Sequence, residues 1–186
     1  MAKFVFKAGH DINKDPGACD PAQPWEGDYI DTKEAVWCRE VALLASDIAK
    51  SKGHQAIFMQ DDDLNLVCRK ANESGADAFV DLHLNAAVNT SALGPETYCY
   101  PGSKAGRRLA DCVHEKLIAN LGAQQRDRHV REANFKVLRD TNMPAILVEA
   151  GFITNVWEES IIHQAWYKKA VAEAIVDGCL EFTGEE

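Results

Sequence analysis

Three apolar segments of the sequence lead directly into residues that can bind a metal ion or move protons. FVFKAGH ends on His10, AFVDLH ends on His83, and AILVE ends on Glu149. A lone histidine in such a place is more often a packing residue, and a carboxylate after four apolar residues is costly to bury unless another group pairs with it. Three such segments in one chain indicate a shared site.

The residue types favour metal-assisted hydrolysis. Two histidines and a carboxylate around an open fourth position are a common catalytic zinc arrangement, and other divalent transition metals accept the same ligands. Hydrolysis also needs a second acidic residue, so that one ligates and one acts as general base. The stretch WEGDYIDTKEAVW offers four, and spacing alone does not choose among them: Glu26, Asp28, Asp31 and Glu34. Glu34 is favoured because the dipole of the predicted helix stabilises a carboxylate in its first turn by about 0.3–1 kcal/mol.

These residues must be positioned by short strands that alternate with helices. Short segments rich in β-branched or aromatic residues, bounded by Gly, Pro, Asp or Asn, predict strands; they are 3–9, 55–59, 77–82, 96–100, 135–138 and 145–148. Amphipathic segments predict helices; they are 34–52, 64–74, 103–121, 165–182 and a shorter one near 156–163. We therefore expect an α/β fold: a single three-layer domain with a largely parallel twisted sheet of about six strands flanked by helices.

The expected fold agrees with the expected site. Ligands in open α/β folds bind beyond the carboxyl ends of the strands, which is where His10, His83 and Glu149 fall. We predict that the domain spans residues 1–182 and that 183–186 form a tail or the start of a linker.

Composition excludes several classes of partner. The net charge of −9 argues against nucleic acid, since phosphate binding needs a basic field. No apolar stretch approaches the roughly 20 residues of a membrane span, so we expect no membrane insertion. The start, MAKFVFKAGH, shows no signal-peptide pattern, and we expect synthesis in the cytoplasm.

The six cysteines have no CxxC spacing, which favours free thiols over a disulfide framework or a cysteine metal cluster.

Four motifs, in order along nearly the whole chain, carry a family resemblance. They are AGH with DPGA a few residues later, a glutamate that opens a long helix before Gly53, LHLNAA, and ANFKVLRDTNMPAILVEAGFITN. Together they resemble the zinc-dependent N-acetylmuramoyl-L-alanine amidases of the Amidase_3 type, found in bacterial autolysins and phage endolysins. The last motif is the most specific. The chain departs from the family pattern at Lys7 and Ala8, where an Asp-Pro pair is frequent, and at DIN (11–13), which replaces a glycine-rich turn.

The resemblance implies an activity and a role for each site residue. It implies that His10, Glu34 and His83 bind Zn²⁺ and that Glu149 is the catalytic base. The reaction would be hydrolysis of the amide between N-acetylmuramic acid and L-alanine in peptidoglycan, which degrades the bacterial cell wall. Burial after the apolar run AILV would raise the pKa of Glu149 towards neutrality, as a general base requires.

Residues outside the motifs are less clearly assigned. Asn85 either hydrogen-bonds substrate or structures its loop. The basic run 126–139 is either a solvated segment or a source of arginines that bind stem-peptide carboxylates, for which we select Arg128 and Arg131. The remaining histidines are predicted to be surface or packing residues: His54, His114, His129 and His163.

Two alternative functions remain open. One is another zinc peptidase or deacylase on the same fold, and the other is a non-catalytic wall-binding module. The expected partner is peptidoglycan, both glycan strand and stem peptide, which the protein would reach after release from the cytoplasm. Either a wall-binding domain lies outside this chain, or the catalytic domain works alone.

Overall fold

The computed structural model describes residues 1–19, 32–122 and 125–185. Within these ranges the chain forms a six-stranded sheet with the strand order β2-β1-β3-β6-β4-β5. The strands are β1 (Lys3–Ala8), β2 (Gln55–Met59), β3 (Ala78–Asn85), β4 (Glu96–Cys99), β5 (Val130–Glu132) and β6 (Ala145–Phe152). Neighbouring strands are parallel except β4 and β6, which are antiparallel. The prediction of a largely parallel sheet is confirmed.

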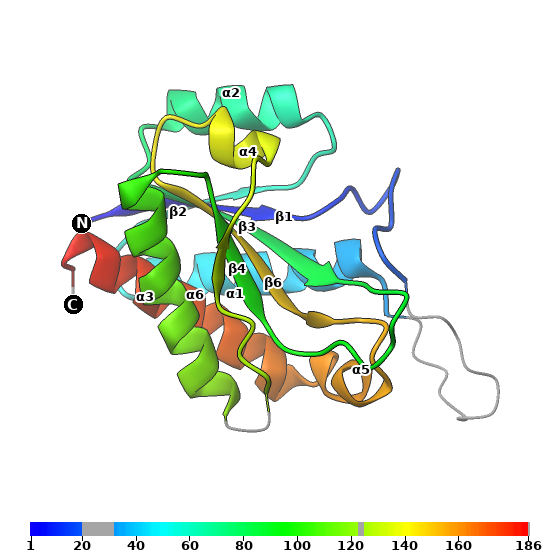
Figure 1. Cartoon of the computed structure of the whole chain (residues 1–186). Coiled ribbons are helices and arrows are strands. Elements are labelled where there is room, and N and C mark those ends of the chain that lie inside the picture. The colour runs from blue at the N-terminus through cyan, green and yellow to red at the C-terminus, as the bar shows by residue number, and fades with distance from the viewer. Residues whose placement is uncertain (20–31, 123–124, 186) are drawn as a thin grey trace.

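Helices cover both faces of this sheet (Figure 1). The helices are α1 (Glu34–Ser51), α2 (Leu64–Ser74), α3 (Lys104–Leu121), α4 (Lys136–Arg139), α5 (Val156–Ile162) and α6 (Ala165–Thr183). α1, α3 and α6 pack on one face, and α2 and α4 pack on the other. The predicted three-layer α/β domain is therefore confirmed. No helix among the described residues is long and apolar enough to cross a bilayer.

The two faces of the sheet differ in how far their apolar surface extends. Because successive strand residues point to opposite faces, each strand contributes alternate residues to each side. The face under α1, α3 and α6 is apolar along its length, with Phe4, Phe6 and Leu82 almost fully buried. The face under α2 and α4 is apolar only at the amino ends of its parallel strands, where Val5 and Phe79 are buried.

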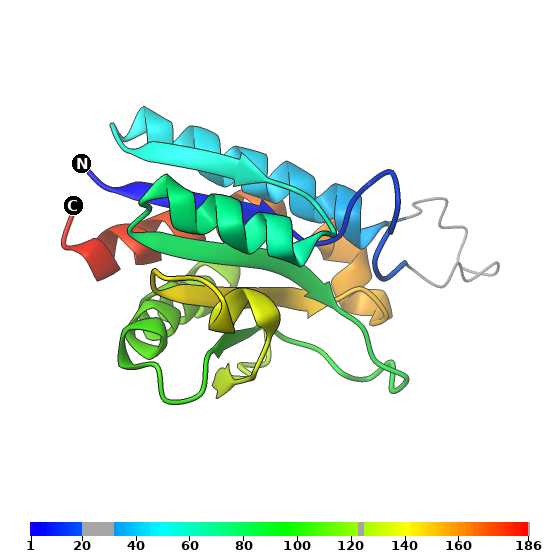
Figure 2. The same cartoon turned by 90° about the horizontal axis from the view of Figure 1, so that it is seen from above.

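The second face becomes polar towards the carboxyl ends of its strands. Continuing along β1, β3 and β6 in steps of two residues, the side chains on this face are Lys7, then Asp81 and His83, then Glu149. These strands run in the same direction, so their carboxyl ends lie together at one edge (Figure 2). This edge is the place predicted for the site.

One predicted strand is wrong. Residues 135–138 were expected to be a strand, but Lys136–Arg139 form the short helix α4, and the strand of this region is β5 at Val130–Glu132. Val137 and Leu138 are both buried against α2, which one helical turn permits and a strand does not, because a strand sends consecutive side chains to opposite faces.

Two predicted strand ends also need correction. β6 continues to Phe152, three residues past Glu149, and β3 continues to Asn85, two residues past His83. β3 and β6 stay paired past the site, where Asn85 pairs with Phe152. The register of the two strands shifts between His83 and Asn85. The predicted domain end at 182 falls in the last turn of α6, and the division from residue 183 onward stays a prediction.

Candidate functional site

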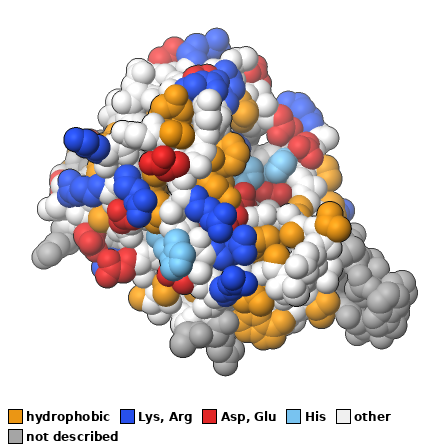
Figure 3. Space-filling view, viewed as in Figure 1, with side chains coloured by type: hydrophobic (Ala, Val, Ile, Leu, Met, Phe, Trp, Pro, Cys, Tyr) orange, Lys and Arg blue, Asp and Glu red, His pale blue; other side chains and the backbone are white. Residues whose placement is uncertain are grey.

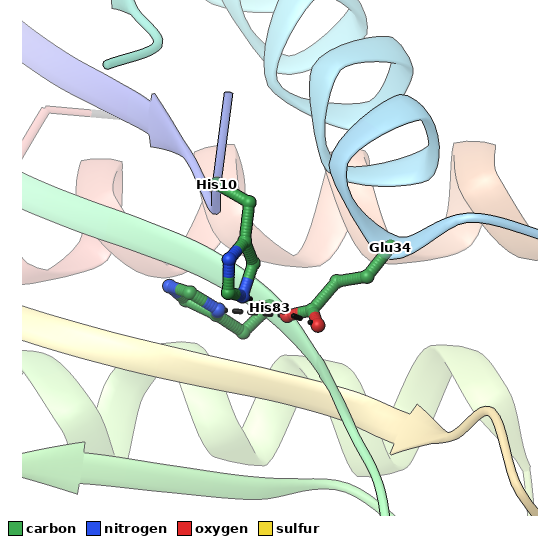
Figure 4. Close-up of side chains that lie close together, drawn as sticks. All are labelled: His10, Glu34 and His83. Atoms are coloured by element: carbon green, nitrogen blue, oxygen red, sulfur yellow. Dashed lines mark hydrogen bonds and ion pairs between the residues drawn. The ribbon is translucent and has the colours of Figure 1, made fainter. Parts of the chain in front are cut away.

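His10, Glu34 and His83 come together at the carboxyl edge of the sheet (Figure 4). His10 follows β1 by two residues, Glu34 is the first residue of α1, and His83 lies near the end of β3. His83 Nδ1 is 2.8 Å from Glu34 Oε1, and His10 Nε2 is 3.3 Å from Glu34 Oε2. One donor atom of each residue lies within 4.8 Å of the others, so these residues can hold a metal ion.

Two glycines allow this close approach. A Cβ atom at Gly9 would lie 2.6 Å from the His83 ring, and one at Gly17 would lie 2.6 Å from the His10 ring and 2.7 Å from Glu34 Oε2. Gly17 also has a φ of +69°, which favours glycine. His10 itself has a φ of 57°, an uncommon value for a residue with a side chain. The backbone here is arranged around the three side chains.

The Glu34 carboxylate is held in place by backbone as well as by histidine. Its Oε2 accepts from the Ala18 N–H at 2.8 Å, and its Oε1 accepts from the Leu84 N–H at 3.2 Å. Burial alone would raise the pKa of Glu34, but the hydrogen bonds with His10 and His83 outweigh it and lower the pKa to about 2. Glu34 is therefore anionic at any physiological pH.

The second nitrogen of each histidine also faces a carboxylate. His10 Nδ1 is 2.7 Å from Asp15 Oδ2, and His83 Nε2 is 3.4 Å from Asp81 Oδ1. The hydrogen bond with Glu34 raises the pKa of His10. Burial would lower the pKa of His83, but Asp81 and Glu34 raise it to about 10. The cluster thus attracts positive charge, and its oxygen and nitrogen donors suit Zn²⁺ or a similar divalent ion.

Glu149 lies next to this group without belonging to it. It is the register partner of His83 across β3 and β6. Its Oε2 is buried and has no hydrogen-bond partner in the described part of the chain. Burial raises the pKa of Glu149, His83 opposes the rise, the carboxylates Glu34 and Glu96 add to it, and the resulting pKa is about 7. A carboxylate with this pKa can accept and release a proton near neutral pH.

A cavity opens beside these residues. Its volume is about 530 Å³, and its wall includes His10, His83 and Glu149 together with the apolar side chains of Leu64, Phe135, Val137 and Leu147. Figure 3 shows histidine and acidic side chains gathered beside hydrophobic ones on this face of the molecule. The group is therefore accessible to a substrate from solvent.

The three residues proposed to bind substrate converge on one buried carboxylate, Glu96. Asn85 Nδ2 donates to Glu96 Oε1 at 2.6 Å, Arg128 Nε donates to Oε2 at 2.9 Å, and Arg131 Nε is 3.2 Å from Oε2. Glu96 is the register partner of Glu149 across β4 and β6. His83, Glu149 and Glu96 therefore stand in one row across three adjacent strands.

Sequence reasoning missed four charged residues at this edge: Lys7, Asp15, Asp81 and Glu96. Lys7 and Asp81 sit between buried apolar residues inside predicted strands, and Glu96 is the first residue of another predicted strand. A charge inside an otherwise apolar strand was the available signal, because such a charge needs a partner.

The other sequence candidates lie outside the group. Glu26, Asp28 and Asp31 fall outside the described residues. The remaining histidines make local contacts away from the site: His54 with Ala2, His114 with Thr97 and Asp127, His129 with Asp127, and His163 with Glu159. All six cysteines lie in the described ranges and are free thiols, as expected.

Comparison with known proteins gives the same result at three levels. Residues 5–181 match the family model described as N-acetylmuramoyl-L-alanine amidase. The crystal structure of an N-acetylmuramoyl-L-alanine amidase from Clostridium difficile 630 superposes with a TM-score of 0.88 at 30% identity, covering 100% of this chain and 98% of that one. The catalytic domain of the amidase CwlV from Bacillus (Paenibacillus) polymyxa var. colistinus gives a TM-score of 0.87 at 27% identity, covering all of both chains.

The sequence relatives are longer than this chain. The N-acetylmuramoyl-L-alanine amidase LytC of Bacillus subtilis (strain 168) is 43% identical over 115 residues, which are 61% of this chain and 23% of LytC. The aligned residues thus span about a quarter of the length of that relative.

Proposed function

The chain belongs to the N-acetylmuramoyl-L-alanine amidase family, and from that premise we propose that it hydrolyses the amide between N-acetylmuramic acid and L-alanine in peptidoglycan. The observation that carries the proposal is the His10–Glu34–His83 group with Glu149 beside it, whose buried Oε2 has no hydrogen-bond partner among the described residues. We assign the group as the ligands of Zn²⁺ and Glu149 as the general base. Residues 1–182 form the catalytic domain in this proposal.

The assignment of ligands rests on one anionic carboxylate and two imidazoles that would release a proton when the metal ion binds. Glu34 is fixed as a carboxylate by its histidine and backbone contacts. Each imidazole has one nitrogen towards Glu34 and the other towards a second carboxylate, an arrangement typical of metal-binding histidines. When bound, Zn²⁺ supplies Lewis-acid chemistry: it acidifies water and polarises the scissile carbonyl.

Glu149 moves the proton. Its carboxylate accepts a proton from the attacking water and then delivers it to the amine of L-alanine as the amide bond breaks. Glu149 is suited to both steps because burial raises its pKa to about 7, so the protonated and ionised forms are close in free energy.

Arg128 and Arg131 bind the stem peptide. Both guanidinium groups contact Glu96 through Nε, and among the described residues their terminal nitrogens have no acceptor, so they can bind one from the substrate. Two arginines share one carboxylate, so the pair carries one excess positive charge beside Glu149. A peptide carboxylate is the acceptor that matches this charge and the planar guanidinium geometry.

The proposal places the site of action in the cell wall. The test is digestion of defined muropeptides by the zinc-loaded protein, with products identified by mass spectrometry. We expect a free lactyl carboxyl group and a peptide with a new N-terminal L-alanine. Cleavage inside the stem peptide, or release of acetate, would instead establish a peptidase or a deacetylase. Binding to walls without any product would establish a non-catalytic module.

A further inference from the structure

A buried ion pair lies beside the proposed metal ligands. Lys7 Nζ is 3.1 Å from Asp81 Oδ1, and the two side chains are 3% and 2% exposed. Lys7 and Asp81 are register partners on the adjacent parallel strands β1 and β3. Both line the same cavity as His83. The proposed function uses Asp81 only as a carboxylate beside His83 and gives Lys7 no role.

Fold stability does not account for this pair. Taking charges out of water costs several kcal/mol per ion, and a well-packed apolar pair of similar volume is often as stabilising or more so. The preceding positions on the same face, Val5 and Phe79, are apolar and buried. Asp81 Oδ1 also makes no hydrogen bond of good geometry within the described residues. This oxygen lies 3.1 Å from Lys7 Nζ and 3.4 Å from His83 Nε2, between the cation and the imidazole.

The His83 ring spans the distance from Glu34 to Asp81. Asp81 and His83 are two residues apart on β3, so both side chains lie on the same face. Nδ1 of the ring is 2.8 Å from Glu34 Oε1, and Nε2 is 3.4 Å from Asp81 Oδ1. A neutral imidazole carries one N–H. If that N–H is on Nε2, it lies on the side of the ring nearest Asp81, whose Oδ1 is 3.4 Å away, and the lone pair of Nδ1 lies on the side of Glu34.

His10 has the opposite arrangement of its ring nitrogens. Its Nε2 faces Glu34 at 3.3 Å, and its Nδ1 faces Asp15 at 2.7 Å. The two histidines therefore turn different nitrogens towards the group, and a separate carboxylate stands at the other nitrogen of each. Asp15 is half exposed, whereas Asp81 is buried and needs Lys7 to balance its charge.

We propose that Asp81, with its charge balanced by Lys7, is a positioning residue that holds the His83 proton on Nε2 and so presents Nδ1 to the metal ion. This inference rests on the proposed function only in that His83 is a metal ligand. It predicts that the Lys7–Asp81 pair serves metal affinity and adds little to the stability of the fold.

The first test compares metal affinity and stability in one double variant. Lys7→Met with Asp81→Leu replaces the pair by apolar side chains of similar size. We expect a cooperatively folded protein whose Zn²⁺ affinity, measured by chelator competition, is about 10–100-fold weaker, the usual loss when an outer partner of a ligating histidine is removed. Lys7→Met with Asp81→Asn keeps an acceptor oxygen beside His83 without leaving a buried cation unpaired, and it should recover part of that affinity.

The matched control removes an exposed ion pair at a distance from the site. Lys52 and Asp177 are 2.8 Å apart with side chains 46% and 41% exposed. Lys52→Gln with Asp177→Asn should leave Zn²⁺ affinity unchanged. Wild-type affinity in the Lys7→Met, Asp81→Leu variant would overturn the proposal.

The second test needs no variant and reads the proton directly. In zinc-loaded protein with ¹⁵N-labelled histidine, the ring shifts of His83 should place the proton on Nε2 and the metal ion on Nδ1; a proton on Nδ1 would overturn the proposal. Both readouts are independent of turnover. Zinc binding without amide cleavage would contradict only the proposed function, whereas a wild-type protein that binds no Zn²⁺ would contradict both.

Discussion

Glu96 and Glu149 stand opposite each other in the antiparallel pairing of β4 and β6, yet their surroundings differ. Glu96 is paired with Arg128 and Arg131 and accepts from Asn85 and from the Tyr98 hydroxyl. Glu149 has an oxygen with no partner among the described residues. The charge of Glu96 is thus neutralised by cations, whereas the neighbouring Glu149 can exchange a proton.

This difference predicts the effect of Glu149→Gln. The amide has nearly the same shape but cannot take a proton from water, so kcat should fall by about 10²–10⁴-fold, the usual contribution of a general base. Zinc content, measured by elemental analysis, should stay at the wild-type level because Glu149 is not in the ligand group. Near-normal turnover in this variant would refute the assignment of Glu149.

His83→Ala, unlike Glu149→Gln, should lower the zinc content of the protein. It removes a donor from the His10–Glu34–His83 group, and Zn²⁺ affinity should fall by more than the roughly 10–100-fold typical of losing an outer partner. His114→Ala is the matched control, because His114 is also buried and hydrogen-bonded to Thr97 and Asp127 but lies apart from the group. Equal zinc content in the two variants would contradict the ligand assignment.

Arg128→Ala should weaken substrate binding more than chemistry. Loss of a charge-assisted contact to a stem-peptide carboxylate is worth about 1.5–3 kcal/mol, which corresponds to roughly a 10–100-fold rise in KM with kcat little changed. Arg107→Ala on α3 is the control, since Arg107 is ion-paired with Asp111 on the surface. With muropeptides whose carboxylates are amidated, wild type and Arg128→Ala should have similar KM values. An unchanged KM on both substrates would show that the two arginines serve only to hold Glu96.

The parts of the site that the sequence predicted are those with a local signature. His10, His83 and Glu149 each follow an apolar run, and Glu34 opens an amphipathic helix; the family resemblance then grouped them. The structure brings His10, Glu34 and His83 together as expected. The helix at Lys136–Arg139 was missed because its single turn is too short to show a helical period.

The residues that the sequence did not reveal depend on strand order. A charged residue inside FVFKAG or AFVDLH was visible, but its partner was not, because the Lys7–Asp81 contact exists only if β1 and β3 are adjacent and in this register. The same holds for Glu96, whose arginine partners approach from β5 and the segment before it. Non-local pairing of this kind has no signal in a single sequence.

The buried carboxyl group of Glu158 should make the stability of the fold depend on pH. It is fully buried, and its Oε2 accepts from the Gly94 and Phe152 N–H groups while its Oε1 has no partner in the described ranges. Burial raises the pKa of Glu158 from 4.5 to about 7. Between these pH values the folded state binds the proton that the unfolded state has released. The free energy of unfolding should therefore fall as pH rises through this window, by about 3 kcal/mol at most from this group.

Glu158→Gln removes this dependence because the amide resembles the protonated acid at every pH. In urea unfolding of metal-free protein, we expect the variant and the wild type to be similarly stable near pH 4.5 and the variant to become the more stable of the two above pH 7. Glu181→Gln is a control in which stability should depend on pH in the opposite direction. The hydrogen bond with Lys116 lowers the pKa of Glu181, so ionised Glu181 stabilises the fold at neutral pH and this stabilisation is lost on acidification. The variant should therefore be less stable than the wild type at neutral pH and approach it at low pH. If the free energy of unfolding changed with pH in the same way for wild type and Glu158→Gln, the prediction would be wrong. Glu158 would then ionise at the same pH in the folded and unfolded chain, and its buried oxygen would have a partner such as ordered water.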